Sequence, residues 1–276
     1  MRTEGLTVSR RQTPGASHAP RRRAGFGAAL RSELTKLRTV RSTYWTLVAL
    51  IVVTVIIGFF TCALTGPGQT GPGYDPTWLS LEGFIIGQLA IAVLGVLTIT
   101  SEYSTGMIQT SLIVQPRRGT IFAAKAAAFS LVSLVAGLVA AFTSFWVGQS
   151  LLDKRGIGTS IGHPHVLRAL IGAALFLTVS GLLAMGFGAI CRYTAGAISA
   201  AIGVLFLTMI LEAFLPASVQ TVVDKWIPLN AGSQIWSTVS LPSDHQFSPW
   251  TGFVVFTVYA ALVFAAGLVL FLGRDA

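Results

Sequence analysis

SEYSTGMIQTSLIVQPRR, residues 101–118, joins two long apolar runs in the first half of the chain. Gly106 allows a bend, and the residues after it can form a short helix that Pro116 ends. Arg117 and Arg118 place the segment on the positively charged side of a membrane. A bilayer-spanning chain does not need so ordered a connection to turn around. We therefore expect this segment to contact a partner.

The composition indicates an integral membrane protein. The chain has 276 residues, of which 53% are hydrophobic and only 11% are charged. Soluble domains are about a quarter charged. The net charge of +9 does not indicate nucleic-acid binding, because the basic residues cluster beside the predicted spans, where membrane topology explains them.

The hydropathy pattern predicts an all-α integral membrane protein with six transmembrane helices in one bundle. The first span has 21 residues, which cover about 31 Å as a helix and therefore match the hydrocarbon core. The predicted spans are residues 44–64, 79–101, 121–149, 166–190, 195–215 and 250–272.

The distribution of basic residues predicts the orientation. Six spans place both termini on one side, and that side receives fifteen of the 19 Lys and Arg residues, ten of them before the first span. This excess predicts a multi-pass protein of the plasma membrane with both termini in the cytoplasm. The remaining four are Lys154, Arg155, Arg168 and Lys225.

The chain before the first span divides into two parts. Residues 1–25 are polar and read as a disordered cytoplasmic tail. Residues 26–43 predict an amphipathic helix that lies in the membrane interface, and residues 44–276 form the transmembrane domain. The alternative is that 26–43 is only the solvated start of the first span. The apolar side of this helix is formed by Phe26, Leu30, Leu34 and Leu37.

The connection over residues 216–249 has an interrupted apolar pattern. It is too apolar for a solvated loop, and its proline and glycine residues break it too often for another span. We expect a pair of short, half-buried helices of the re-entrant kind before the last span.

The pattern Glu102-Tyr103-x-x-Gly106, followed by a short apolar helix and Pro116-Arg117-Arg118, resembles the loop between the second and third spans of ABC-2 type (type-2 ABC exporter) transporter permeases. In that family the loop carries a coupling helix that docks on a separate ATPase. The alternative is a polar loop with an ordinary positive-inside signal. The residues that the resemblance assigns to coupling are Glu102, Tyr103, Gly106, Met107, Ile108, Leu112, Pro116, Arg117 and Arg118.

The resemblance implies the permease subunit of an ATP-binding cassette export system. Its expected partners are an ABC ATPase subunit, a second permease copy or a related permease, and the lipid bilayer. ATP and Mg would bind the partner ATPase, and this chain would bind no cofactor. The substrate does not follow from these residues.

Sequence motifs assign no catalysis to the chain itself. It has no Gly-x-x-x-x-Gly-Lys-Ser/Thr phosphate loop, so we expect ATP hydrolysis to reside in another subunit. His163 and His165 have no third metal ligand nearby in sequence, and we expect a solvated loop there instead of a metal site.

Polar residues within the spans bear on the alternatives. No ionisable group lies clearly at a predicted midplane, which disfavours a secondary transporter or channel that works without an ATPase. A non-transporting membrane anchor or sensor is the other alternative. We expect Lys125 to reach toward the interface and Gln88 to hydrogen-bond a neighbouring helix; the alternative for Gln88 is that it lines a substrate route. Glu102 has two readings: a contact with the ATPase or the interfacial helix, or a carboxylate in water.

Overall fold

The computed structural model describes residues 25–104, 118–239 and 246–273. It is 84% helical, and these residues contain no strand. Six helices are long and apolar enough to cross a membrane. The prediction of an all-α bundle of six transmembrane helices is therefore confirmed.

In chain order the elements are α1 (Phe26–Thr39), α2 (Arg41–Leu64), the 3-10 turn η1 (Pro67–Gln69), α3 (Pro76–Leu81), α4 (Phe84–Ser104), α6 (Arg118–Asp153), α7 (Val166–Cys191), α8 (Thr194–Ile202), the π-helix η2 (Gly203–Leu207), α9 (Thr208–Glu212), α10 (Ala217–Val223), the 3-10 turn η3 (Asp224–Trp226), α11 (Pro228–Ser233), the 3-10 turn η4 (Gln234–Trp236) and α12 (Pro249–Gly273).

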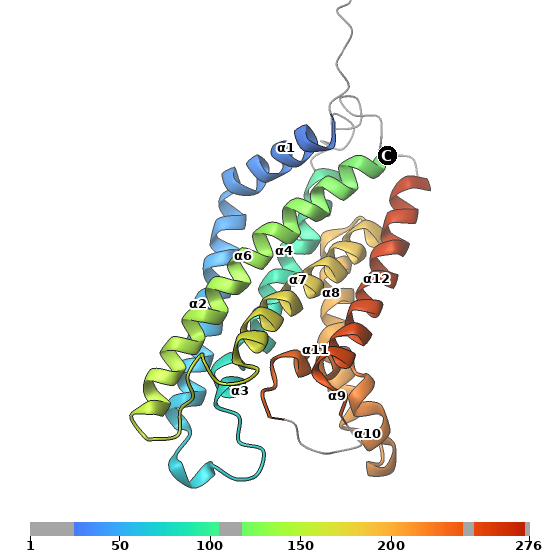
Figure 1. Ribbon diagram of the computed structural model, residues 1–276. Coiled ribbons are helices and arrows are strands. Elements are labelled where there is room, and N and C mark those ends of the chain that lie inside the picture. Colours follow the sequence, from blue (N-terminus) through green and yellow to red (C-terminus); the bar gives the residue numbers. More distant parts are fainter. Residues whose placement is uncertain (1–24, 105–117, 240–245, 274–276) are drawn as a thin grey trace, which may run out of the picture.

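The two ends of the bundle differ in what they carry. Helix α1, the start of α6 and the end of α12 lie at one end, which we call the α1 end (Figure 1). The loops beside α3, together with α9 and α10, lie at the opposite end, which we call the α3 end (Figure 1). Helices α10 and α11 are the short helices that the sequence predicts before the last span.

Helix α1 is set at an angle to α2 (Figure 1). The break between them is Val40, whose backbone is extended. Helix α2 begins at Arg41, three residues before the predicted start of the first span. Tyr44 and Trp45 lie on its first turns and are 62% and 66% exposed, as expected for aromatic side chains at a membrane interface.

The second span contains a break that the sequence does not predict. Helix α3 ends at Leu81 and α4 begins at Phe84. At Gly83 a Cβ atom would lie 2.2 Å from the backbone oxygen of Thr54 on α2. Only glycine allows this close approach, so the break lies where the second span crosses the first.

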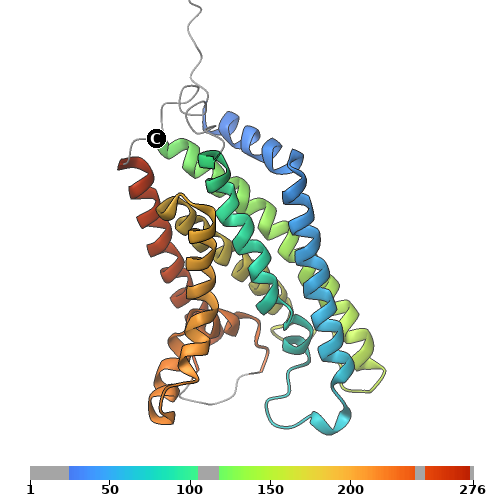
Figure 2. The same cartoon turned by 180° about the vertical axis from the view of Figure 1, so that it is seen from behind.

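Helix α7 is the centre of the bundle. In its most apolar stretch of 18 residues, 72% is buried inside the protein. The corresponding stretches of the fifth and sixth spans are each only 17% buried. Figures 1 and 2 show α2 and α12 on the two outer sides of the bundle, with α7 between them. A Cβ atom on Gly95 of α4 would lie 2.3 Å from the backbone oxygen of Gly181, so α4 and α7 pack closely along small residues.

Candidate functional site: a buried charge cluster at the α1 end

Four charged side chains from three helices form a cluster at the α1 end. Glu33 and Lys36 come from α1, Glu102 from α4 and Lys125 from α6. The Lys125 ammonium lies 2.8 Å from Oε2 of Glu33 and 2.6 Å from Oε1 of Glu102. The Lys36 ammonium lies 2.8 Å from Oε1 of Glu33 and 2.9 Å from Oε1 of Glu102. Each lysine therefore bridges both carboxylates, and the formal charges of the four groups cancel.

The cluster is largely shielded from solvent. Lys125 is 3% exposed, and Glu33 and Glu102 are each 7% exposed. Removing a charge from water costs several kcal/mol, and only well-placed opposite charges and hydrogen bonds offset that cost. The arrangement consequently favours one relative placement of the three helices, because separating them would leave buried charges unpaired.

Lys36 is the most exposed member of the cluster, with 35% of its side chain accessible. Burial alone would lower the pKa of the Lys36 ammonium. Hydrogen bonds and the charges of Glu33 and Glu102 outweigh burial and raise the pKa above its ordinary value. Lys36 therefore stays protonated at neutral pH and holds α1 against the end of α4.

The helical spacing of residues in α1 explains how the Glu33 side chain reaches the interior. Leu30, Leu34 and Leu37 are half-buried, and Glu33 lies among them in sequence and is buried. Helix α1 packs chiefly on α6. Phe26, which the sequence places on the same apolar side, is 47% exposed at the start of the helix.

The last turn of α4 is also held from its other side. The Arg192 guanidinium lies 5.0 Å from the ring centre of Tyr103, a cation–π geometry. Thr194 Oγ1 donates a 3.0 Å hydrogen bond to Thr100 Oγ1. The turn between α7 and α8 thus contacts the same end of α4 that α1 and α6 contact through Glu102.

The structure describes only part of the predicted coupling segment. Glu102 and Tyr103 lie in the last turn of α4, and Arg118 is the first residue of α6. Glu102 is not a solvated carboxylate, because it is buried and bridges to Lys36 on α1. Lys125 is buried in the cluster, where its ammonium pairs with Glu33 of α1. The predicted site residues outside the described ranges are Gly106, Met107, Ile108, Leu112, Pro116 and Arg117.

Sequence reasoning missed Glu33 and Lys36 as partners of this site. One signal was present in the sequence: Glu33 is an acidic residue between the apolar positions Leu30 and Leu34 of a helix that is otherwise basic. An acid on the apolar side of an interfacial helix indicates a buried cationic partner.

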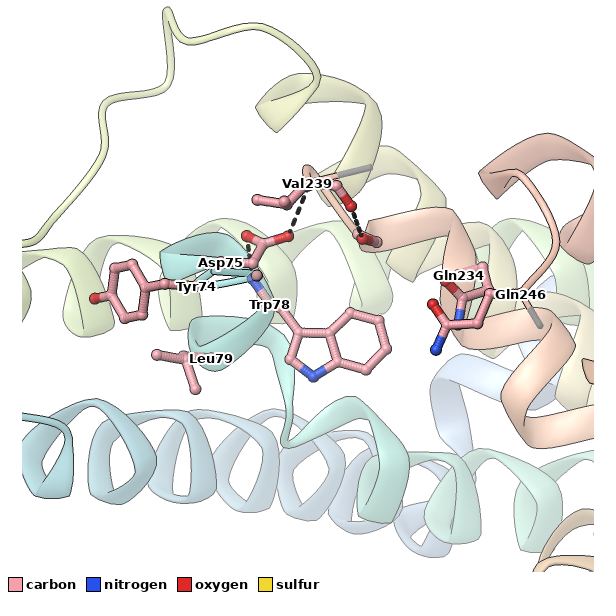
Figure 3. Close-up of a pocket in the computed structure, with 9 residues that line it drawn as sticks. Tyr74, Asp75, Trp78, Leu79, Gln234, Val239 and Gln246 are labelled. Carbon is pink, nitrogen blue, oxygen red and sulfur yellow. Dashed lines mark hydrogen bonds between the residues drawn. The ribbon is translucent and has the colours of Figure 1, made fainter. Parts of the chain in front are cut away.

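A second polar region lies at the α3 end. Asp75 caps α3, since its Oδ1 accepts 3.0 Å hydrogen bonds from the backbone N–H groups of Thr77 and Trp78. The same carboxylate accepts hydrogen bonds from Thr238 and Val239, so it ties α3 to the segment after η4. Figure 3 shows Asp75 beside Trp78 in a pocket whose opposite side carries Gln234 and Gln246.

The expected hydrogen bond from Gln88 to a neighbouring helix is not formed among the described residues. The Gln88 side chain is fully buried, and no described residue gives its amide nitrogen or its amide oxygen a hydrogen-bond partner. The side chain lies one turn from Phe84 on α4.

The chain matches no model of a known protein family, and a search of curated proteins finds no significant relative.

Proposed function

We propose that this chain is the membrane-spanning permease subunit of an ATP-driven export system of the ABC-2 type, working with a separate ATPase. One observation carries the proposal. Glu102 and Lys125 lie on either side of residues 105–117, the segment expected to dock on the ATPase, and both are joined to α1 by ion pairs. A displacement of that segment would therefore move α1, α4 and α6 together.

The chemistry of the cluster supports transmission of movement. Because its charges are buried and balanced, α1 and the flanking ends of α4 and α6 move at least cost as one unit. ATP binding and hydrolysis in the partner would displace this unit, and the bundle would change the side of the membrane to which it opens. Two such permeases, identical or related, would act with two ATPase subunits.

Charge distribution supports placing the α1 end in the cytoplasm of a cell with this chain in its plasma membrane. Arg31, Arg38 and Arg41 are exposed at that end. A cytoplasmic ATPase would have access to this end of the bundle only in that orientation.

The test is purification of the tagged full chain from its native membranes in mild detergent. We expect an ATPase with a phosphate-loop motif to co-purify. Substituting Glu102→Gln removes the shared charge and should weaken ATPase retention and turnover in the reconstituted complex, and we expect the same of Gly106→Pro. The matched control is Glu82→Gln, which alters a half-buried carboxylate at the opposite end of the same span.

Two outcomes would overturn the proposal. One is the absence of any ATPase from the purified native complex. The other is normal association and turnover in the Glu102 and Gly106 variants, which would mean that residues 101–118 only connect two spans. Thermal unfolding of each variant separates lost coupling from lost folding.

A further inference from the structure

Two hollows adjoin at the α3 end. The larger has a volume of about 540 Å³ and the smaller about 270 Å³, and Trp78, Gln234 and Gln246 line both. We call the larger one the Asp224 hollow. Its other lining residues are Met209, Ala213, Gln220, Asp224, Asn230 and Ser233. Its volume falls in the range of pockets that hold small molecules, and its polar groups are few enough to orient a ligand.

The shared wall offers an aromatic surface and two amide side chains. The Trp78 ring packs against Trp236 with 5.6 Å between ring centres, which fixes its position. Figure 3 shows the indole directed toward Gln234 and Gln246. Within the described part of the chain, neither glutamine side chain has a hydrogen-bond partner. These two amides are therefore available to a ligand.

The charged side chains that line the two hollows are acidic, Asp75 in the smaller and Asp224 in the larger. No lysine or arginine lines either of them among the described residues. Asp75, beside the smaller hollow, already accepts hydrogen bonds from α3 and from Thr238, so its role is structural. Asp224 is different, because it lines the larger hollow and is engaged on only one side.

Asp224 keeps one carboxylate oxygen available. The Asn230 amide donates to Oδ1, and no donor from the described residues reaches Oδ2. The neighbouring Lys225 does not neutralise it through a salt bridge, since its ammonium lies over the Phe247 ring, 5.7 Å from the ring centre. A half-buried carboxylate in this position is stabilised by a cation that enters the hollow.

We propose that the Asp224 hollow binds a small organic cation, with its ammonium group between the Trp78 ring and the Asp224 carboxylate. A tryptophan face attracts quaternary and primary ammonium groups electrostatically. Hydroxyl or carbonyl groups of the ligand meet the amides of Gln234 and Gln246. The site belongs to this chain alone, so it does not depend on the proposed ATPase partner.

Choline is the probe, because it combines a quaternary ammonium with one hydroxyl. Isothermal titration calorimetry of the full chain in nanodiscs should show choline binding. The uncharged isostere 3,3-dimethylbutan-1-ol has the same shape and hydroxyl, and it should bind at least about tenfold more weakly, because it gains neither the cation–π nor the carboxylate contact. No binding of choline at millimolar concentration, or equal binding of the two probes, would overturn the proposal.

Variants locate the site. Asp224→Asn preserves shape while removing the charge, and it should lower choline affinity about tenfold or more. Asp153→Asn is the matched control, since it removes an exposed carboxylate at the end of α6 that lines neither hollow. An equal loss in both variants would mean diffuse surface attraction and would overturn the proposal. Trp78→Phe, with a smaller ring face, should weaken choline several-fold and replaces Asp224→Asn if that variant fails to fold.

Discussion

The Lys125 ammonium on α6 lies 2.6 Å from the Glu102 carboxylate on α4, and the two residues are 23 positions apart in the chain. Residues 105–117 lie between them. Glu33 of α1 contacts the same ammonium at 2.8 Å. The helices that enter and leave this segment are therefore fixed to one another and to the first helix before any partner binds.

The first prediction concerns the balance of this cluster. Lys125→Met leaves two buried carboxylates with only Lys36 between them. Breaking a buried ion pair by removing one partner costs about 3–5 kcal/mol, so we expect a clear loss of stability. Thermal unfolding in nanodiscs measures it. Lys154→Met, which removes an exposed lysine at the α3 end, is the control and should leave the melting temperature unchanged.

A double variant sharpens this test. Lys125→Met combined with Glu102→Gln removes one charge of each sign and leaves Glu33 paired with Lys36. The double variant should be less destabilised than the sum of the two single variants, because the charge left unpaired in each single variant is gone. Strict additivity would mean that the groups do not interact and would contradict the cluster as a functional unit.

The second prediction uses two glutamines in opposite environments. Gln88 is fully buried without partners, whereas Gln149 donates 2.9 Å hydrogen bonds to Pro76 O and Ser80 Oγ and accepts one from Thr159. Replacing an unpaired buried amide by an apolar side chain of similar shape removes a desolvation cost of about 1–3 kcal/mol. Gln88→Met should therefore raise the melting temperature, and Gln149→Met should lower it.

The outcome of the Gln88 substitution also bears on transport. If Gln88→Met stabilises the protein but lowers transport in the reconstituted complex, the amide is kept for function at the expense of stability. A loss of stability in Gln88→Met would contradict the prediction, because it would require a hydrogen bond that the structure does not contain.

The sequence predicted the helices well because each span is an apolar run long enough to cross a bilayer. It could not predict the break at Gly83, since the cause is the close approach of Thr54 on another helix. The sequence did not predict the π-helix at Gly203–Leu207 either, because an uninterrupted apolar run predicts a continuous α-helix.

The candidate site was only half predictable. Glu102 stood out because it ends an apolar run and belongs to a recognisable pattern. Its partners Lys36 and Lys125 lie 66 and 23 residues away, and residue spacing along one chain does not reveal which helices meet. Lys125 looked like a residue that reaches toward the interface because lysines near helix ends usually do so.

The third prediction concerns the contact of α4 with α7. A Cβ atom on Gly95 would overlap the Gly181 backbone oxygen, and backbone does not yield as a flexible side chain does. Gly95→Ala should therefore destabilise the bundle by roughly 1–3 kcal/mol through overpacking. Gly203→Ala is the control, because nothing lies within 4 Å of its added Cβ atom. Equal melting temperatures for the two variants would mean that α4 and α7 are not so closely packed.

The last prediction concerns orientation, and it uses single cysteines with a membrane-impermeant maleimide on intact cells. Cys62 is buried and Cys191 is exposed, so the background is Cys191→Ser. Gln69 and Ser160 are exposed near the α3 end, and Arg38 is exposed on α1.

The excess of Lys and Arg on the side of the termini predicts that this side faces the cytoplasm. Gln69→Cys and Ser160→Cys should then react on intact cells, and Arg38→Cys should react only after permeabilisation. Labelling of Arg38→Cys alone on intact cells would reverse the orientation, and the buried cluster would then lie on the side of the membrane that a cytoplasmic ATPase does not reach.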